Sequence, residues 1–139
     1  MVYQLQSSTT LLPRKRKVQC RNGHYLEVRP DGTVRGTKNP DSIYTVFHLD
    51  SVGSNMTTLW AAEAALYVGI DNRGNIITSA TKISACTLRE SLDTEFFNSF
   101  AMEFSPRRLH WLSISAQGKV RSSILTSSRN VQFITKPLH

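Results

Sequence analysis

The residues that could carry catalysis or bind a metal ion are few and stand apart in this sequence. The four histidines and two cysteines are His24, His48, His110, His139, Cys20 and Cys86. None of them has a partner at the spacing of a catalytic or zinc-binding motif. Two cysteines cannot build a disulfide framework, and a free cysteine usually packs as a small apolar side chain. We therefore expect two buried free thiols and no enzyme activity, metal site or cofactor.

Positive charge is concentrated at both ends of the chain. Residues 1–26 contain five bases and no acid, and residues 104–139 contain six bases and no acid. The segment 27–103 holds all ten acids against six bases, a net charge of −4. If the fold places the two ends together, they form one basic face suited to a polyanion. The alternative is that these bases only keep two tails soluble.

Three segments of similar pattern indicate how the chain is organised. They span 24–37, 66–79 and 110–123, and their glycines stand at positions 32, 74 and 118. Apolar residues alternate on both sides of each glycine, which is the pattern of a strand, a tight turn and a second strand. His24 and His110 occupy equivalent positions, so we expect them to pack within the hairpins rather than to bind a ligand.

Further strands are expected after each hairpin. Phe47, Leu88 and Phe133 follow the three glycines by 15, 14 and 15 residues, and each is taken to mark a third strand. A fourth strand per unit is expected near 56–61, 96–103 and 17–20. A propeller usually needs four or more blades, whereas a closed three-fold barrel leaves no exposed strand edges. Closure also places the first and last strands side by side.

The sequence therefore predicts an all-β domain, a β-trefoil of about twelve strands in three pseudo-repeats. We expect this domain at residues 14–139, after a flexible N-terminal tail at residues 1–13.

Residues 74–97 closely resemble the signature of the fibroblast growth factor family. Gly74, Cys86, Glu90 and Phe97 stand at its spacing, although Phe97 replaces a tyrosine and Ala85 replaces an acid. The resemblance extends over roughly residues 14 to 138. It implies a β-trefoil that binds a receptor tyrosine kinase and uses heparan sulfate as co-ligand.

By position, the resemblance implies an apolar receptor-binding patch with polar anchors around it. The expected receptor-binding residues are Lys38, Glu90, Glu95, Phe97, Phe133 and Leu138. An exposed aromatic residue flanked by charge is a plausible interface hot spot. For Phe97 the alternative is a place in the core. Gln19 stands where the family usually has a tyrosine, so part of the apolar patch is missing.

The resemblance also implies a heparin site at Asn22, Lys119, Arg121 and Arg129. The segment 118–133 is shorter than is typical of the family and is rich in serine where other members carry more lysine and arginine. We therefore expect weaker heparin binding, partly offset by the bases at 14–17. This basic run could equally be a processing or nuclear-localisation signal.

One branch of the family is intracellular and binds the cytoplasmic tails of voltage-gated sodium channels. Segments 41–47, 65–68 and 89–91 resemble that branch, whereas 20–23 resembles secreted members. The triplet at 55–57 is a glycosylation acceptor, which has meaning only in a secreted protein.

The first residues of the chain leave both locations open. Residues 1–12 do not have the pattern of a signal peptide, and no apolar run is long enough to cross a membrane. We expect a secreted, monomeric ligand of a fibroblast growth factor receptor and heparan sulfate, without nucleic-acid binding or membrane insertion. A cytoplasmic or nuclear protein is the alternative.

Overall fold

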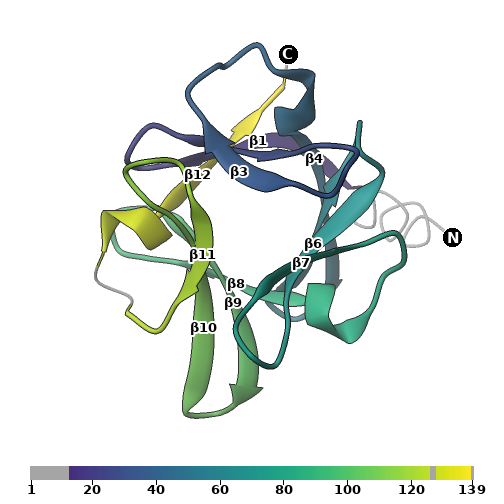
Figure 1. Cartoon of the computed structure of the whole chain (residues 1–139). Coiled ribbons are helices and arrows are strands. Elements are labelled where there is room, and N and C mark those ends of the chain that lie inside the picture. Colours follow the sequence, from purple (N-terminus) through teal and green to yellow (C-terminus); the bar gives the residue numbers. More distant parts are fainter. Residues whose placement is uncertain (1–12, 126–127, 139) are drawn as a thin grey trace, which may run out of the picture.

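The computed structural model describes residues 13–125 and 128–138, which form twelve strands (Figure 1). The strands are β1 (Arg14–Cys20), β2 (Tyr25–Val28), β3 (Val34–Thr37), β4 (Val46–Gly53), β5 (Met56–Ala61), β6 (Leu66–Ile70), β7 (Ile76–Ser79), β8 (Leu88–Leu92), β9 (Asn98–Ser105), β10 (Arg108–Ile114), β11 (Val120–Ser123) and β12 (Phe133–Pro137). Three short 3₁₀ turns cover Ile43–Thr45, Ser84–Cys86 and Arg129–Val131. In the described part, no helix is long and apolar enough to span a membrane. Except for Pro13, the expected N-terminal tail lies outside the described residues.

Six strands close into a barrel by antiparallel pairing, in the order β1, β4, β5, β8, β9, β12 and back to β1. The other six form the hairpins β2–β3, β6–β7 and β10–β11, which Figure 1 shows as three lobes around a common centre. The predicted β-trefoil is therefore confirmed. Phe47, Leu88 and Phe133 lie in β4, β8 and β12 as expected, and β5, β9 and β1 supply the fourth strand of each unit.

The core is formed by inward side chains of the barrel strands together with those of the hairpin strands β2, β6 and β10. Phe47, Leu88 and Phe133 have no exposed surface, and Phe100 meets Phe133 edge to face with ring centroids 5.9 Å apart. Cys20 and Cys86 are also buried, and both thiols are free. Burial raises the pKa of each thiol, so both stay protonated and unreactive at neutral pH.

The three hairpins meet in a ring of contacts between glycines and the next repeat. Each hairpin glycine packs against one residue of the next repeat, four positions after that repeat's own glycine. The pairs are Gly32 with Thr78, Gly74 with Ser122 and Gly118 with Gly36. The carbonyl of Gly74 accepts a hydrogen bond from the Ser122 hydroxyl, and the carbonyl of Gly118 accepts one from the Gly36 amide at 2.7 Å. A Cβ on Gly32 would lie 3.4 Å from Thr78 Oγ1, which completes the ring.

The two equivalent histidines fill the space beneath this ring, as expected. His24 lies so close that a Cβ on Gly118 would come within 3.3 Å of its ring, and His110 Nδ1 would be 2.7 Å from a Cβ on Gly74. Burial, and after it the charge of Lys38, lowers the pKa of His24. The His24 imidazole is therefore neutral at neutral pH.

The first hairpin contains a buried carboxylate. Glu27 is 1% exposed, and its oxygens accept from Arg35 Nε at 2.6 Å and from the Ser42 hydroxyl at 2.5 Å. Arg29 Nε lies 3.5 Å away. Burial by itself raises the pKa of Glu27, but these hydrogen bonds and the two arginine charges outweigh it and leave the pKa below its ordinary value. Because the charge has partners, its burial is tolerated.

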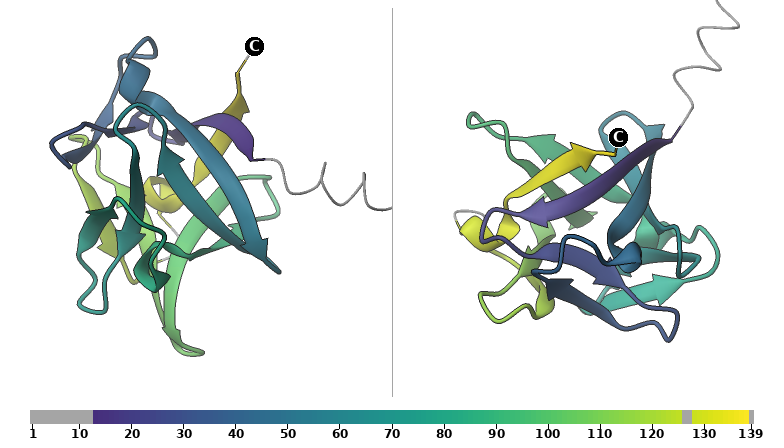
Figure 2. Two further views of the ribbon diagram at one scale, coloured as in Figure 1. Left: turned by 90° about the vertical axis from the view of Figure 1, so that its right-hand side faces the viewer. Right: turned by 90° about the horizontal axis from the view of Figure 1, so that it is seen from above.

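The pairing of β1 with β12 brings the two basic ends together. Residues Arg16 to Cys20 face Pro137 to Phe133 in antiparallel register, and Figure 2 shows the two strands side by side. Lys17 is directly opposite Lys136, and both ammonium groups lie within 6 Å of the Tyr25 ring centroid, at 5.9 and 5.6 Å.

The ring contact can be tested by comparing two glycines. Gly74 and Gly23 both have positive φ, +82° and +100°, but a Cβ meets a neighbour only at Gly74. Gly23→Ala should cost about 1–2 kcal/mol of unfolding free energy from the left-handed backbone alone. Gly74→Ala should cost about 1–3 kcal/mol more, because the methyl group overpacks against His110. Urea denaturation followed by tryptophan fluorescence measures both. Equal losses would contradict the ring contact.

Candidate functional site

Glu90 lies in a polar groove formed where β1, β5, β8 and β9 meet. One carboxylate oxygen accepts from Arg14 Nη2 at 2.9 Å, and the other accepts from Asn98 Nδ2 at 3.0 Å. The Glu90 amide donates to the Asn55 carbonyl at 2.8 Å, which ties the β4–β5 turn to β8. The groove has a volume of about 570 Å³, and Glu90 keeps part of its side chain exposed in it. Glu90 is thus partly accessible in the groove, and sequence reasoning missed its partner Arg14, 76 residues away.

Phe97 lies at the surface beneath an arginine. Its ring centroid is 4.7 Å from the Arg21 guanidinium carbon, and Arg21 also contacts Glu95 at 3.4 Å. Gln132 accepts from the same guanidinium at 3.0 Å. Phe97 is half-buried just before β9, whereas Phe100 of β9 is in the core. The structure thus places an aromatic ring, a cation and an acid together at the surface.

Phe133 requires a correction. We expected it in an exposed patch, but it is a fully buried core residue. The neighbouring Ile134 is 43% exposed and lies opposite Gln19 on the outer face of β1 and β12. The repeat pattern contained this signal, because Phe133 is equivalent to the inward-facing Phe47, and adjacent residues of a strand point to opposite faces. Sequence reasoning missed Ile134.

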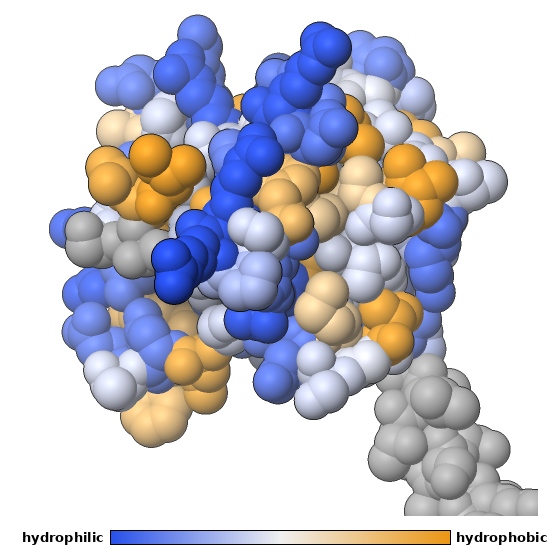
Figure 3. All heavy atoms as spheres, turned by 90° about the horizontal axis from the view of Figure 1, so that it is seen from below, coloured by the Kyte–Doolittle hydropathy of each residue, from blue (hydrophilic) through white to orange (hydrophobic). Residues whose placement is uncertain are grey.

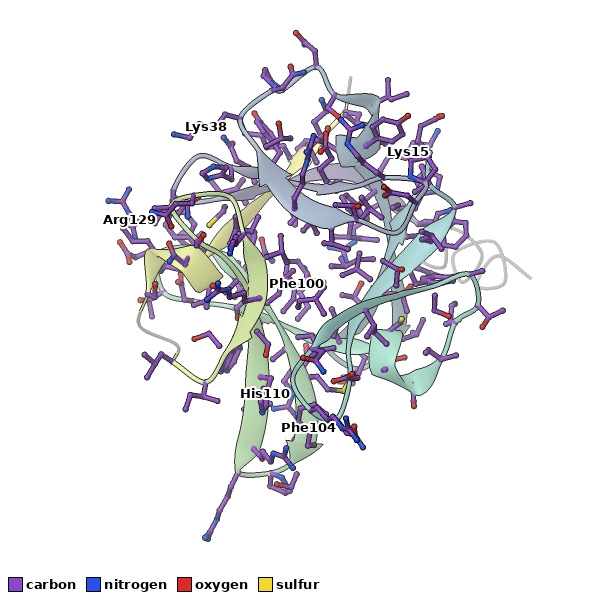
Figure 4. The ribbon with its side chains drawn as sticks, in the orientation of Figure 1. Lys15, Lys38, Phe100, Phe104, His110 and Arg129 are labelled. Carbon is purple, nitrogen blue, oxygen red and sulfur yellow. The ribbon has the colours of Figure 1, made fainter. Side chains whose placement is uncertain are left out.

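The other predicted receptor-binding residues are spread over the surface. Leu138 is exposed beyond the end of β12. Lys38 is also exposed. Figure 4 shows Lys38 and Arg129 pointing outward on one side of the molecule, with Lys15 on the other. Lys38 therefore lies on the same side as Arg129, one of the predicted heparin residues.

The predicted heparin residues lie around the β10–β11 turn and the following 3₁₀ turn. Lys119, Arg121 and Arg129 are exposed, and within the described residues they form no salt bridge with an acid. The backbone of Lys119 also pairs with that of Arg35 in the first hairpin, in an isolated antiparallel β-bridge. Lys119 and Arg121 follow the β10–β11 turn, and Arg129 stands in the 3₁₀ turn after β11.

The side-chain amide of Asn22 forms two hydrogen bonds within the protein. Its Nδ2 donates to the Ile114 carbonyl at 2.8 Å and to Asn130 Oδ1 at 3.0 Å, so it ties the β1–β2 turn to the turn that carries Arg129. The structure gives it a role in positioning these loops.

The surface elsewhere is mixed. Figure 3, seen from below, shows separate apolar patches among hydrophilic side chains. In the residues that the structure describes, no group of three or more metal-binding side chains is found.

The ion pair in the groove can be tested with a double-mutant cycle. Arg14→Met and Glu90→Gln remove the charges while keeping most of the side-chain volume. We expect a coupling energy of about 1 kcal/mol, at the upper end for exposed pairs, because both side chains are partly buried. Denaturation at low and high salt measures it, and Lys82→Met with Asp50→Asn, a more exposed pair 3.5 Å apart, is the control. A coupling near zero would mean that the contact does not stabilise the groove.

Comparison with known proteins identifies the family of the chain. The model of the family described as "Fibroblast growth factor" matches residues 14–134, which include every strand from β1 to the start of β12. A protein named "Fibroblast growth factor homolog", from Autographa californica nuclear polyhedrosis virus, is 28% identical over 110 residues. The match covers 79% of this chain but only 60% of the viral protein. Because the family match spans nearly the whole chain, this protein belongs to the fibroblast growth factor family.

Proposed function

We propose that this protein is a secreted growth-factor-like ligand that binds a receptor tyrosine kinase with heparan sulfate as co-ligand. The single observation that carries the proposal is the position of Glu90 and Phe97. Both stand at the family's signature spacing, and both keep exposed surface while their neighbours Leu88 and Phe100 fill the core.

The proposed receptor surface combines an aromatic anchor with charge. Phe97 is held by Arg21 and flanked by Glu95, and Ile134 supplies exposed apolar surface nearby on β12. Phe97 is adjacent to Asn98, which pairs with the residue before Ile134. An aromatic residue with a charged rim is a common hot-spot arrangement in protein interfaces. Phe133 has no part in this surface because it is buried.

The proposed heparan sulfate surface consists of Lys38, Lys119, Arg121 and Arg129. Sulfate groups need several cations at close spacing, and the release of counterions supplies much of the affinity for a polyanion. The support for this site is that Lys119, Arg121 and Arg129 make no salt bridge in the described part, so their charge is available to a ligand.

Heparin affinity chromatography tests the polyanion site. Replacing Lys119, Arg121 and Arg129 with alanine should lower the salt concentration needed for elution, because three cations no longer contact sulfate. A matched control removes three exposed cations elsewhere: Lys15, Arg73 and Arg107. Both variants lose the same charge. Equal shifts in elution would contradict a localised site.

Receptor binding tests the other surface. Glu90→Ala and Phe97→Ala should each weaken binding to a fibroblast growth factor receptor ectodomain by about 1–3 kcal/mol, measured by surface plasmon resonance. Phe97→Tyr should bind at least as well as wild type, because the ring remains and the hydroxyl can find a partner. Circular dichroism of each variant separates lost binding from lost folding.

The same experiment distinguishes the proposed role from the alternative intracellular role. Binding of the wild type to a sodium-channel tail, with no binding to any receptor ectodomain, would contradict the proposed function.

A further inference from the structure

Asn55 begins the one Asn-X-Ser/Thr triplet in the whole sequence, Asn55-Met56-Thr57. The structure places Asn55 in the turn between β4 and β5, where its side chain is exposed and its φ is +60°. Asparagine tolerates this left-handed conformation better than most residues do. The acceptor side chain therefore stands at an accessible hairpin tip.

The third residue of the triplet is hidden. Thr57 is 1% exposed, and its hydroxyl donates to the Asp50 carbonyl at 3.1 Å. Its strand is paired on both sides, with Ser51 of β4 and Leu88 of β8 facing Thr57. The enzyme that glycosylates asparagine must recognise Asn55 and Thr57 together, and it cannot reach the threonine hydroxyl in the folded protein. It can bind the triplet only while the β4–β5 hairpin is open.

Asn55 is also adjacent to the groove that contains Glu90. The Asn55 carbonyl accepts from the Glu90 amide at 2.8 Å, and the next residue, Met56, is paired with Arg89. Asn55, Arg14 and Glu90 line the same groove. A glycan attached here is bulky and hydrated, so it would stand at the rim of that groove.

We propose that Asn55 is N-glycosylated before the β4–β5 hairpin closes, and that the glycan restricts access to the Arg14–Glu90 groove. The donor is an oligosaccharide linked to a lipid diphosphate. The Asn55 amide nitrogen loses a proton and forms a bond to the anomeric carbon, while the bond from that carbon to the diphosphate breaks and the lipid diphosphate leaves with the electron pair. The modification rests on the proposed secretion of the protein, and the restriction of access rests in addition on the proposed receptor role of the groove.

The modification is tested in a cell-free translation system with endoplasmic reticulum microsomes. The full chain, preceded by a cleavable signal peptide, should gain the mass of one glycan, and an endoglycosidase should remove it. Asn55→Gly should abolish the gain without backbone strain at this positive φ. Thr57→Ser keeps the triplet and should retain the gain. Microsomes added after the chain has folded should yield no glycan.

These outcomes decide the first half of the proposal. Chains that have entered the microsomes are protected from added protease. If these chains show no added mass, the proposed modification is wrong. Glycan added equally well to the folded chain would overturn the requirement for an open hairpin.

Access to the groove is tested by binding to receptor ectodomain. The glycosylated protein should bind at least several-fold more weakly than its endoglycosidase-treated form. A matched control combines Asn55→Gly with Ile77→Thr, which creates a triplet at the exposed Asn75 of the β6–β7 hairpin. This control glycan should not weaken binding. Equal binding with and without the Asn55 glycan would overturn the restriction. If the endoglycosidase-treated wild-type protein bound no receptor, the proposed function would fail, while the mass gain would still establish the modification.

Discussion

The structure depends on one constraint, the close meeting of three hairpins around a common centre. Gly32, Gly74 and Gly118 each have positive φ and each contact the next repeat through Thr78, Ser122 and Gly36. Two of these contacts are hydrogen bonds to the glycine carbonyl, so they also satisfy backbone groups that the turns would otherwise leave unpaired. The ring holds the three repeats in register and closes one end of the barrel.

Once the ring and the barrel are closed, the face of each barrel residue follows from strand alternation. Phe47, Leu88 and Phe133 point inward, so Ile134 points outward. The proposed receptor-binding residues then fall on outer faces and on the segments that connect strands, where side chains can contact a partner without disturbing the core. A rigid scaffold that presents binding residues in this way is common among small β domains.

Closure also decides which charges remain available. Arg14 and Arg21, from the basic N-terminal segment, pair with Glu90 and Glu95 of the acidic middle. Arg35 and Arg29 are held by the buried Glu27. The C-terminal bases near the β10–β11 turn have no such acids around them among the described residues. Closure therefore gives Arg14 and Arg21 acidic partners and leaves Lys119, Arg121 and Arg129 without one in that part of the chain.

The sequence by itself determined the architecture. A repeat of about 42 residues, alternation around a turn glycine and the spacing of Phe47, Leu88 and Phe133 depend on backbone sterics and on the period of two in a strand, which are local properties. The signature around Cys86 was enough to indicate the family, which the family match then established.

Only the tertiary structure decided which distant residues meet. Arg14 reaches Glu90, Asn22 binds Asn130, and Thr57 is hidden between two strands. These contacts join segments that closure of the barrel brings together, and no local pattern records them. The error for Phe133 has a different cause. Strand alternation indicates that this residue is buried, whereas the family resemblance by position implies that it is exposed.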